Sequence, residues 1–148
     1  MSFKIIRPQI KTLLDSVSKI QQVKGYPTLK FTGYPSAYVV PAENDAEYET
    51  TSENIRNYNF IIRLFYTTKD VGVETAMLAM EDLVDDVLNA IDQEDLKGAD
   101  TRTIGIGLPT GYTFINVWAS PSAWGEIVEE NLVMAEVTVS VRVSIDVT

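Results

Sequence analysis

The C-terminal segment alternates strictly between apolar and polar side chains, and this pattern constrains the fold more than any other feature. The aliphatic set is Val137, Val139, Val141, Val143, Ile145 and Val147, and the polar set is Glu136, Thr138, Ser140, Arg142, Ser144 and Asp146. Because successive side chains of a strand point to opposite faces, the segment from about Leu132 onward is predicted to be a half-buried antiparallel strand. At roughly 3.3 Å per residue it extends about 50 Å, further than the roughly 38 Å diameter of a compact domain of this length, so it must bend or protrude.

Residues 58–66 form a second alternating segment. Tyr58, Phe60, Ile62, Leu64 and Tyr66 share one face, and Asn59, Ile61, Arg63 and Phe65 share the other. This pattern predicts a central strand whose first face is covered by helices. The second face is half apolar, so we expect it to contact something else, such as another subunit.

Two segments carry apolar side chains at helical spacing. The first runs from Pro8 to Val23, where Pro8 suits a first helical turn and Gly25 with Pro27 supplies a stop. The second runs from Val71 to Ile91, with Asp70 as the expected N-cap. The rest of the second helix is acidic, so its outer face is expected to be strongly negative. Its acids are Glu74, Glu81, Asp82, Asp85, Asp86 and Asp92.

Glycine and proline divide the remaining segments. Short or edge strands are predicted at residues 29–32 and 37–40, and a further strand from Tyr112 to Ala119 ends at a break over Pro121–Gly125. The polar segment from Glu43 to Arg56 fits either a flexible loop or a projecting hairpin, and we favour the hairpin. The whole order predicts one α+β domain over residues 1–148: a mainly antiparallel sheet with two amphipathic helices packed on one face and a protruding β-hairpin arm.

Composition argues against most catalytic chemistry. The 148 residues include neither cysteine nor histidine. Thiolate and zinc-thiolate sites are thereby excluded and the usual general base near neutral pH is missing, so we do not expect an enzyme. The net charge is −9 and the 12 Lys and Arg residues are scattered, which disfavours a nucleic-acid surface. No segment approaches about 20 apolar residues and the N-terminal segment lacks a secretory signal pattern, so neither a membrane span nor export is expected.

Several local patterns have both a functional and a structural interpretation. The segment Gly105–Gly111 is similar to a phosphate-binding loop, but it lacks a following helix and is predicted to be a plain turn. Asp82, Asp85 and Asp86 could ligate a hard cation, although a solvated helix surface is the favoured interpretation. The seven tyrosines favour packing or protein interfaces over a ligand groove. The segment Ser122–Gly125 is expected in a turn, and the chain has no histidine to activate its serine. Taken together, these patterns predict no catalytic, cofactor-binding or metal site.

The segment from Gly33 to Thr68 combines the opening GYPSAYV, a polar acidic arm and the strand RNYNFIIRLFY. In these features, and in the order of elements along most of the chain, the sequence resembles the tail terminator or tail-completion proteins of long-tailed bacteriophages. Members of that family form homohexameric rings of α+β subunits that cap the tail tube, stop its polymerisation and present the surface that joins the head. The resemblance implies a structural virion protein at the head–tail junction, made in the host cytoplasm.

The implied partners are further copies of the chain, the tail tube protein and a head-completion or connector protein, with DNA passing through the ring without specific binding. No cofactor and no membrane partner is expected. The predicted subunit or partner contacts are Glu43, Asp45, Glu47, Tyr48, Glu49, Arg56 and Trp124. Two alternatives stay open. One is a head-completion or stopper protein of the phage neck, and the other is an α+β small-molecule binding module, which a deep pocket lined by several tyrosines would indicate.

Overall fold

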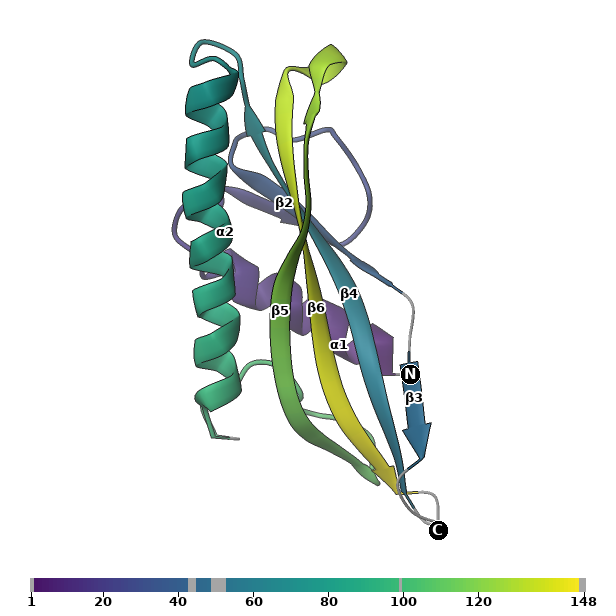
Figure 1. The fold of residues 1–148 in the computed structure, drawn as a ribbon. Coiled ribbons are helices and arrows are strands. Elements are labelled where there is room, and N and C mark those ends of the chain that lie inside the picture. Colours follow the sequence, from purple (N-terminus) through teal and green to yellow (C-terminus); the bar gives the residue numbers. More distant parts are fainter. Residues whose placement is uncertain (1, 43–44, 49–52, 99, 147–148) are drawn as a thin grey trace.

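The computed structural model describes residues 2–42, 45–48, 53–98 and 100–146. Over these residues the chain folds into two α-helices, one short 3-10 helix (η1) and six strands (Figure 1). In chain order these are α1 (Ser2–Asp15), β1 (Gln22–Lys24), β2 (Ser36–Pro41), β3 (Asp45–Tyr48), β4 (Glu53–Thr67), α2 (Val73–Leu96), β5 (Tyr112–Ile127), η1 (Val128–Glu130) and β6 (Leu132–Asp146).

The strands form one sheet in the order β1-β2-β4-β6-β5, and β3 pairs with the part of β4 that β2 does not reach. The β1–β2 pair is parallel and the other pairs are antiparallel. The strands β4 and β6, in the middle of the sheet, pair without a register shift from Glu53↔Asp146 to Thr67↔Leu132. The predicted α+β class with a mainly antiparallel sheet is confirmed, and so is the central place of the strand that contains residues 58–66.

Both helices pack on one face of the sheet and enclose the main core. From β4 this core takes Phe60, Ile62 and Leu64, each 0% exposed. From β6 it takes the predicted aliphatic residues Val137, Val139, Val141, Val143 and Ile145, whereas Val147 lies outside the described residues. In Figure 1, α2 runs along one side of the long strands and α1 lies behind them. The two-faced pattern of β6 is therefore confirmed, because its valines all point toward the helices.

The boundaries predicted for the first helix are wrong. It begins at Ser2 and ends at Asp15, so Pro8 lies in its interior rather than in its first turn. An interior proline removes one helical hydrogen bond, at a cost of about 3 kcal/mol, but Ile6 extends the apolar stripe toward the N-terminus and is 0% exposed. After Asp15 the chain continues in tight turns that still bury Val17 and Ile20. Apolar residues therefore remain buried at helical spacing after the helix has ended, and for this reason the predicted C-terminal boundary is too late.

Three further predictions are corrected. Residues 29–32 form no strand, and only the predicted strand at residues 37–40 is found, as β2. The break over Pro121–Gly125 is absent because β5 continues to Ile127, with an irregular register between Pro121 and Ala123. Proline is tolerated there because β5 is an edge strand and needs no outward hydrogen bond. Helix α2 is capped by Gly72 rather than Asp70, which instead has a φ of 73°.

The expected hairpin is described in part. Strand β3 pairs with β4 from Asp45↔Asn57 to Tyr48↔Asn54. The residues at its turn, 49–52, lie outside the described residues, as do Glu43 and Asn44. That this hairpin protrudes as an arm stays a prediction.

Candidate assembly interface

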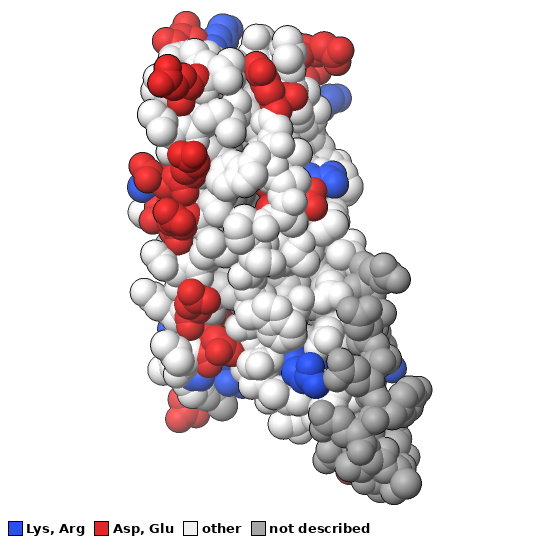
Figure 2. Space-filling view, viewed as in Figure 1, with Lys and Arg blue, Asp and Glu red and all other residues white. Residues whose placement is uncertain are grey.

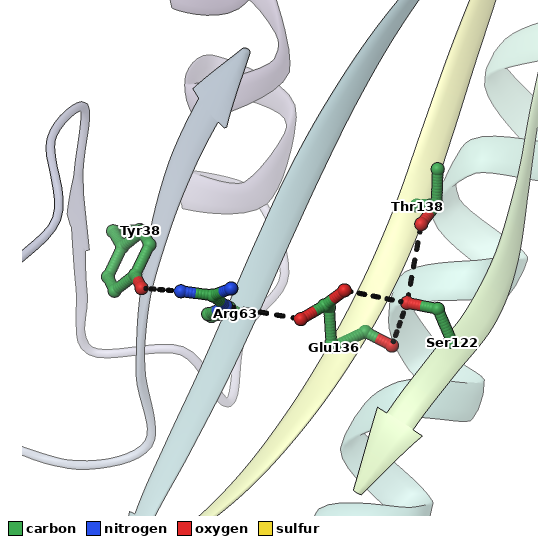
Figure 3. Close-up of polar contacts among 5 residues, drawn as sticks. All are labelled: Tyr38, Arg63, Ser122, Glu136 and Thr138. Carbon is green, nitrogen blue, oxygen red and sulfur yellow. Dashed lines mark hydrogen bonds and ion pairs between the residues drawn. The ribbon is translucent and has the colours of Figure 1, made fainter. Parts of the chain in front are cut away.

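The face of the sheet that the helices leave open carries a ladder of polar side chains across four strands (Figure 3). Arg63 of β4 is its centre. Its Nη1 donates to the Tyr38 hydroxyl of β2 at 2.6 Å, and its Nε lies 3.2 Å from Glu136 Oε2 of β6. The hydrogen bond to Tyr38, followed by that to Glu136, raises the pKa of Arg63 above its ordinary value, so the guanidinium stays charged. The ladder ties β2, β4 and β6 together.

The same ladder reaches the edge strand through Ser122. Its hydroxyl lies 3.2 Å from both the main-chain carbonyl oxygen and the carboxylate Oε1 of Glu136, and Thr138 donates to it at 3.3 Å. Ser122 was predicted in a turn but lies on β5, at the irregular register between Pro121 and Ala123. Its hydroxyl is engaged by carbonyl, carboxylate and hydroxyl groups of one strand, an arrangement that fixes the edge strand to the sheet. The absence of enzyme activity stays an expectation.

Beside the ladder, the open face carries a small apolar cluster. Tyr38, Phe65 and Leu132 are nearly fully buried there, and partly buried side chains surround them. A groove of about 430 Å³ runs over this cluster, lined by Pro27, Thr28, Leu29, Tyr38, Arg63, Phe65, Ile127 and Met134. Tyr38 is the one tyrosine of this lining. The groove therefore differs from the tyrosine-lined pocket that would favour a small-molecule binding module.

A second apolar surface lies at the end of the sheet where α2 begins and β5 meets η1, at the top of Figure 1. A main-chain hydrogen bond of 2.8 Å from Thr68 to Asn131 holds the two connections together. We call the exposed apolar side chains of these connections the end patch: Val71 (40% exposed), Val73 (44%), Trp124 (45%) and Val128 (69%). Exposed acids lie on the same segments: Asp70, Glu74, Glu126, Glu129 and Glu130. Exposed apolar side chains with charged residues on the same segments are typical of a protein-binding surface.

The structure does not bring the predicted contact residues together. Trp124 lies opposite Ala135, near one end of β6, whereas Arg56 lies opposite Val143, near the other. Arg56 forms a hydrogen bond within the chain: its Nη1 donates to the Tyr58 hydroxyl at 3.2 Å. Glu43 and Glu49 lie outside the described residues, and Asp45, Glu47 and Tyr48 are placed on β3 by their backbone alone. Of the predicted residues, Trp124 has a described position suited to a partner.

The glycine-rich segment is a turn, as predicted. Its upstream amides are already occupied, because the fully buried Glu94 accepts from Thr103 N and Ile104 N through Oε1. Gln9 of α1 accepts from Gly105 N at 2.8 Å and donates to Ile106 O at 2.5 Å. Amides that bind a protein carboxylate and an amide are not available to a phosphate. Sequence reasoning missed Glu94, which looked like one more acid of a solvated helix.

The acidic face predicted for α2 is confirmed and appears in Figure 2 as a column of carboxylates along one side of the molecule. Among the described residues, no group of three or more acids is arranged to hold a metal ion. No helix of the described chain is long and apolar enough to cross a membrane.

Comparison with known proteins gives an informative likeness to a solved structure. No protein-family model matches the sequence, and no curated protein matches it. Among solved structures, the fold is similar to that of a chain in the virion of a native gene transfer agent (GTA) particle, with a TM-score of 0.52 and 16% sequence identity. The match covers 97% of this chain and 95% of the virion chain. The protein therefore has, over nearly its whole length, the fold of a component of a gene transfer agent virion.

Proposed function

We propose that this protein is a structural component of a phage or phage-like virion, and that it acts as a tail terminator. In this role a homohexameric ring caps the tail tube, stops its polymerisation and presents the surface to which the head joins. The observation that carries the proposal is the fold likeness to a chain of a phage-like virion particle, which extends over 97% of this chain. The resemblance of residues 33–68 to tail terminator proteins supports the finer assignment.

The sheet edge argues for contacts through side chains rather than through added strands on β5. The outward amide of Val117 is already bound by Asp95 Oδ1 of α2 at 2.8 Å. Pro121 has no amide hydrogen to offer, and the register of β5 is irregular in two places. Edge strands protected in this way resist pairing with another chain. Ring contacts are therefore proposed to involve helix faces and the hairpin of β3 and β4, not the β5 edge.

The end patch supplies a surface for the tube or for the head connector. In a ring, the end patches of all subunits lie on the same face. That face therefore carries exposed apolar side chains together with acids of the same segments. Docking of this face on the last ring of a tube buries the patch and leaves no matching surface for a further tube subunit. The cap thus ends polymerisation by covering the growing surface, and DNA passes through the ring without specific binding.

Two rival functions are separated by different observations. A head-completion or stopper protein would use the same kinds of surface but would bind the head connector and not the tube. A small-molecule binding module would bind its ligand and neither tubes nor connectors. Its described candidate sites are open grooves. The groove beside Arg63 contains a single tyrosine in its lining, and another of about 470 Å³ contains Tyr34 and Tyr66.

The first test is the mass of the purified protein by light scattering over a range of concentrations, with negative-stain imaging of large species. Six-membered rings are expected. Purified tail tubes are then added, and the terminator role predicts density at one end of each tube and no further elongation when tube protein is supplied. Rings that bind connectors but never tubes would reassign the protein to the head side of the neck. A chain that stays monomeric and binds neither tubes nor connectors would end the proposal.

A further inference from the structure

Helix α2 carries a straight stripe of acids on its exposed side. Glu74, Glu81, Asp85 and Asp92 are all exposed, and at 100° per residue they fall within about 40° of one another around the helix axis. The buried side chains of α2 point the opposite way, into the core. Figure 2 shows acidic side chains gathered along the side of the molecule on which α2 lies. We call these four residues the acidic stripe.

Helix α1 carries a stripe of opposite charge. Lys4, Arg7 and Lys11 fall within about 60° of one another around its axis. They lie on a flank of the helix beside the buried Leu14, where Lys4 is exposed and Arg7 and Lys11 are half-buried. Lys11 also forms an ion pair with Asp15 at 3.3 Å. Within the described chain no ion pair is found for Lys4 or Arg7. These three residues, the basic stripe, hold a quarter of the 12 Lys and Arg residues of the chain.

Within the described chain no ion pair joins the two stripes. The described ion pair between the helical layers is made instead by Lys19, in the turns after α1, with Asp86 Oδ2 at 2.9 Å. Both helices pack on the same sheet face, yet α2 lies along one side of the molecule and α1 lies behind the strands (Figure 1). Complementary surfaces on different sides of one subunit suit a head-to-tail contact between copies, the type of contact that generates rings.

We propose that the acidic stripe of one copy docks on the basic stripe of the next copy, and that this contact closes the ring. The inference rests on the proposed ring and names the surfaces that build it. The basic stripe spans about 10 Å and the acidic stripe about 27 Å, so the Glu81–Asp85 part of the acidic stripe can be covered while its ends remain free. Opposite charges at the contact set the order of subunits and disfavour like faces meeting.

The measurement is self-association by light scattering and sedimentation velocity, at 50 mM and 500 mM NaCl. In one variant, Lys4→Glu and Arg7→Glu are combined. In a second, Glu81→Lys and Asp85→Lys are combined, and a third carries all four changes. The matched control combines Lys30→Glu and Lys69→Glu, which alters net charge as much as the first variant but at exposed positions outside both stripes. All substituted side chains are at least partly exposed, and thermal melting checks that each variant is folded.

The wild type and the control are expected to associate alike, with a dissociation constant that rises at least fivefold at 500 mM NaCl because salt screens exposed charges. Each two-site reversal should weaken association at least tenfold, and the four-site swap should restore most of it. A reversal on α1 that leaves association unchanged, or a swap that restores nothing, overturns the inference. A wild type that stays monomeric at both salt concentrations overturns it as well.

Failure of this inference is distinguishable from failure of the terminator proposal. If rings form and are indifferent to all three variants, the ring stands and the acidic stripe is free for another place, such as the DNA channel, where it would repel DNA. If the wild type is monomeric yet caps tail tubes, the terminator role stands and subunits meet only on the tube. Capping tests on the variants use the same tubes, so both questions are answered with one set of proteins.

Discussion

The two faces of the central strands differ although their residues alternate along the same backbone. On the helix-covered face of β4, Phe60 and Ile62 are 0% exposed and belong to the main apolar core. On the open face, between them, Ile61 is half-buried and Arg63 belongs to the polar ladder of Figure 3. One face therefore holds the fold together, and the other fixes the order of the strands while leaving side chains within reach of partners.

The difference implies that stability and assembly can be altered separately. Substitutions on the covered face should unfold the protein before they affect any interface. Substitutions on the open face should have smaller effects on stability, and substitutions at the end patch should leave a folded protein that assembles poorly. Four measurements test this separation, in decreasing order of the expected change in the free energy of unfolding.

The largest effect is expected at Phe60. Phe60→Ala leaves a cavity in the main core and should lower the free energy of unfolding by about 3–5 kcal/mol, which chemical denaturation of the purified chain measures. Its matched control is the next residue, Ile61→Ala on the open face, for which about 1–2 kcal/mol is expected because that side chain is only half-buried. Equal losses for the two variants would contradict the division between the faces.

Glu94 is expected to give the next largest effect, since it is a buried carboxylate on the covered side. Glu94→Ala leaves the amides of Thr103 and Ile104 without their acceptor, and about 1–3 kcal/mol of stability should be lost. Hydrogen exchange at those two amides should accelerate, which a general loss of packing at the helix end would not produce selectively. Glu94→Gln keeps an acceptor oxygen and serves as control. If the two amides exchange no faster in Glu94→Ala than in Glu94→Gln and the wild type, the carboxylate does not hold the turn.

The ladder of the open face should contribute less. Arg63→Ala removes the contacts to Tyr38 and Glu136 and should cost about 1 kcal/mol, because the Arg63 side chain is 39% exposed and water screens the ion pair. A double-mutant cycle of Arg63→Ala with Glu136→Gln measures the coupling directly, and about 0.5–1 kcal/mol is expected. A coupling free energy of zero would mean that the contact between Arg63 and Glu136 does not stabilise the protein. Arg63→Lys should recover only part of the loss, since lysine lacks the planar fork.

The sequence predicted the parts of the fold that depend on local periodicity. The strict alternation of β6, the apolar stripe of α2 and the alternating residues 58–66 were each sufficient to place an element and its buried face. Prediction was wrong where tertiary context decided the local structure. Pro8 lies inside a helix because Ile6 is buried before it, and Pro121 lies inside a strand because that strand is at the edge of the sheet.

The candidate surfaces were less accessible to sequence reasoning because they depend on register. Arg63 and Glu136 are 73 positions apart and become neighbours only when β4 and β6 pair, so no local pattern could join them. The end patch joins the β4–α2 connection to the end of β5, which only the topology reveals. The charge of α2 was predicted correctly, but its partner stripe on α1 was hidden by the misplaced start of that helix.

The smallest effect on stability, and the largest on assembly, is expected at Trp124. Trp124→Ala should cost less than about 1 kcal/mol because the side chain is 45% exposed, yet it should weaken binding to tail tubes at least tenfold, since exposed tryptophans dominate interface energies. Trp118→Ala is a close control, because Trp118 lies on the same strand and is 40% exposed but pairs with Ser140 on the open face, away from the end patch. Tube binding is measured by co-sedimentation at equal protein concentrations. If Trp118→Ala loses binding and Trp124→Ala does not, the open face is the docking surface, and the end patch serves some other contact of the ring.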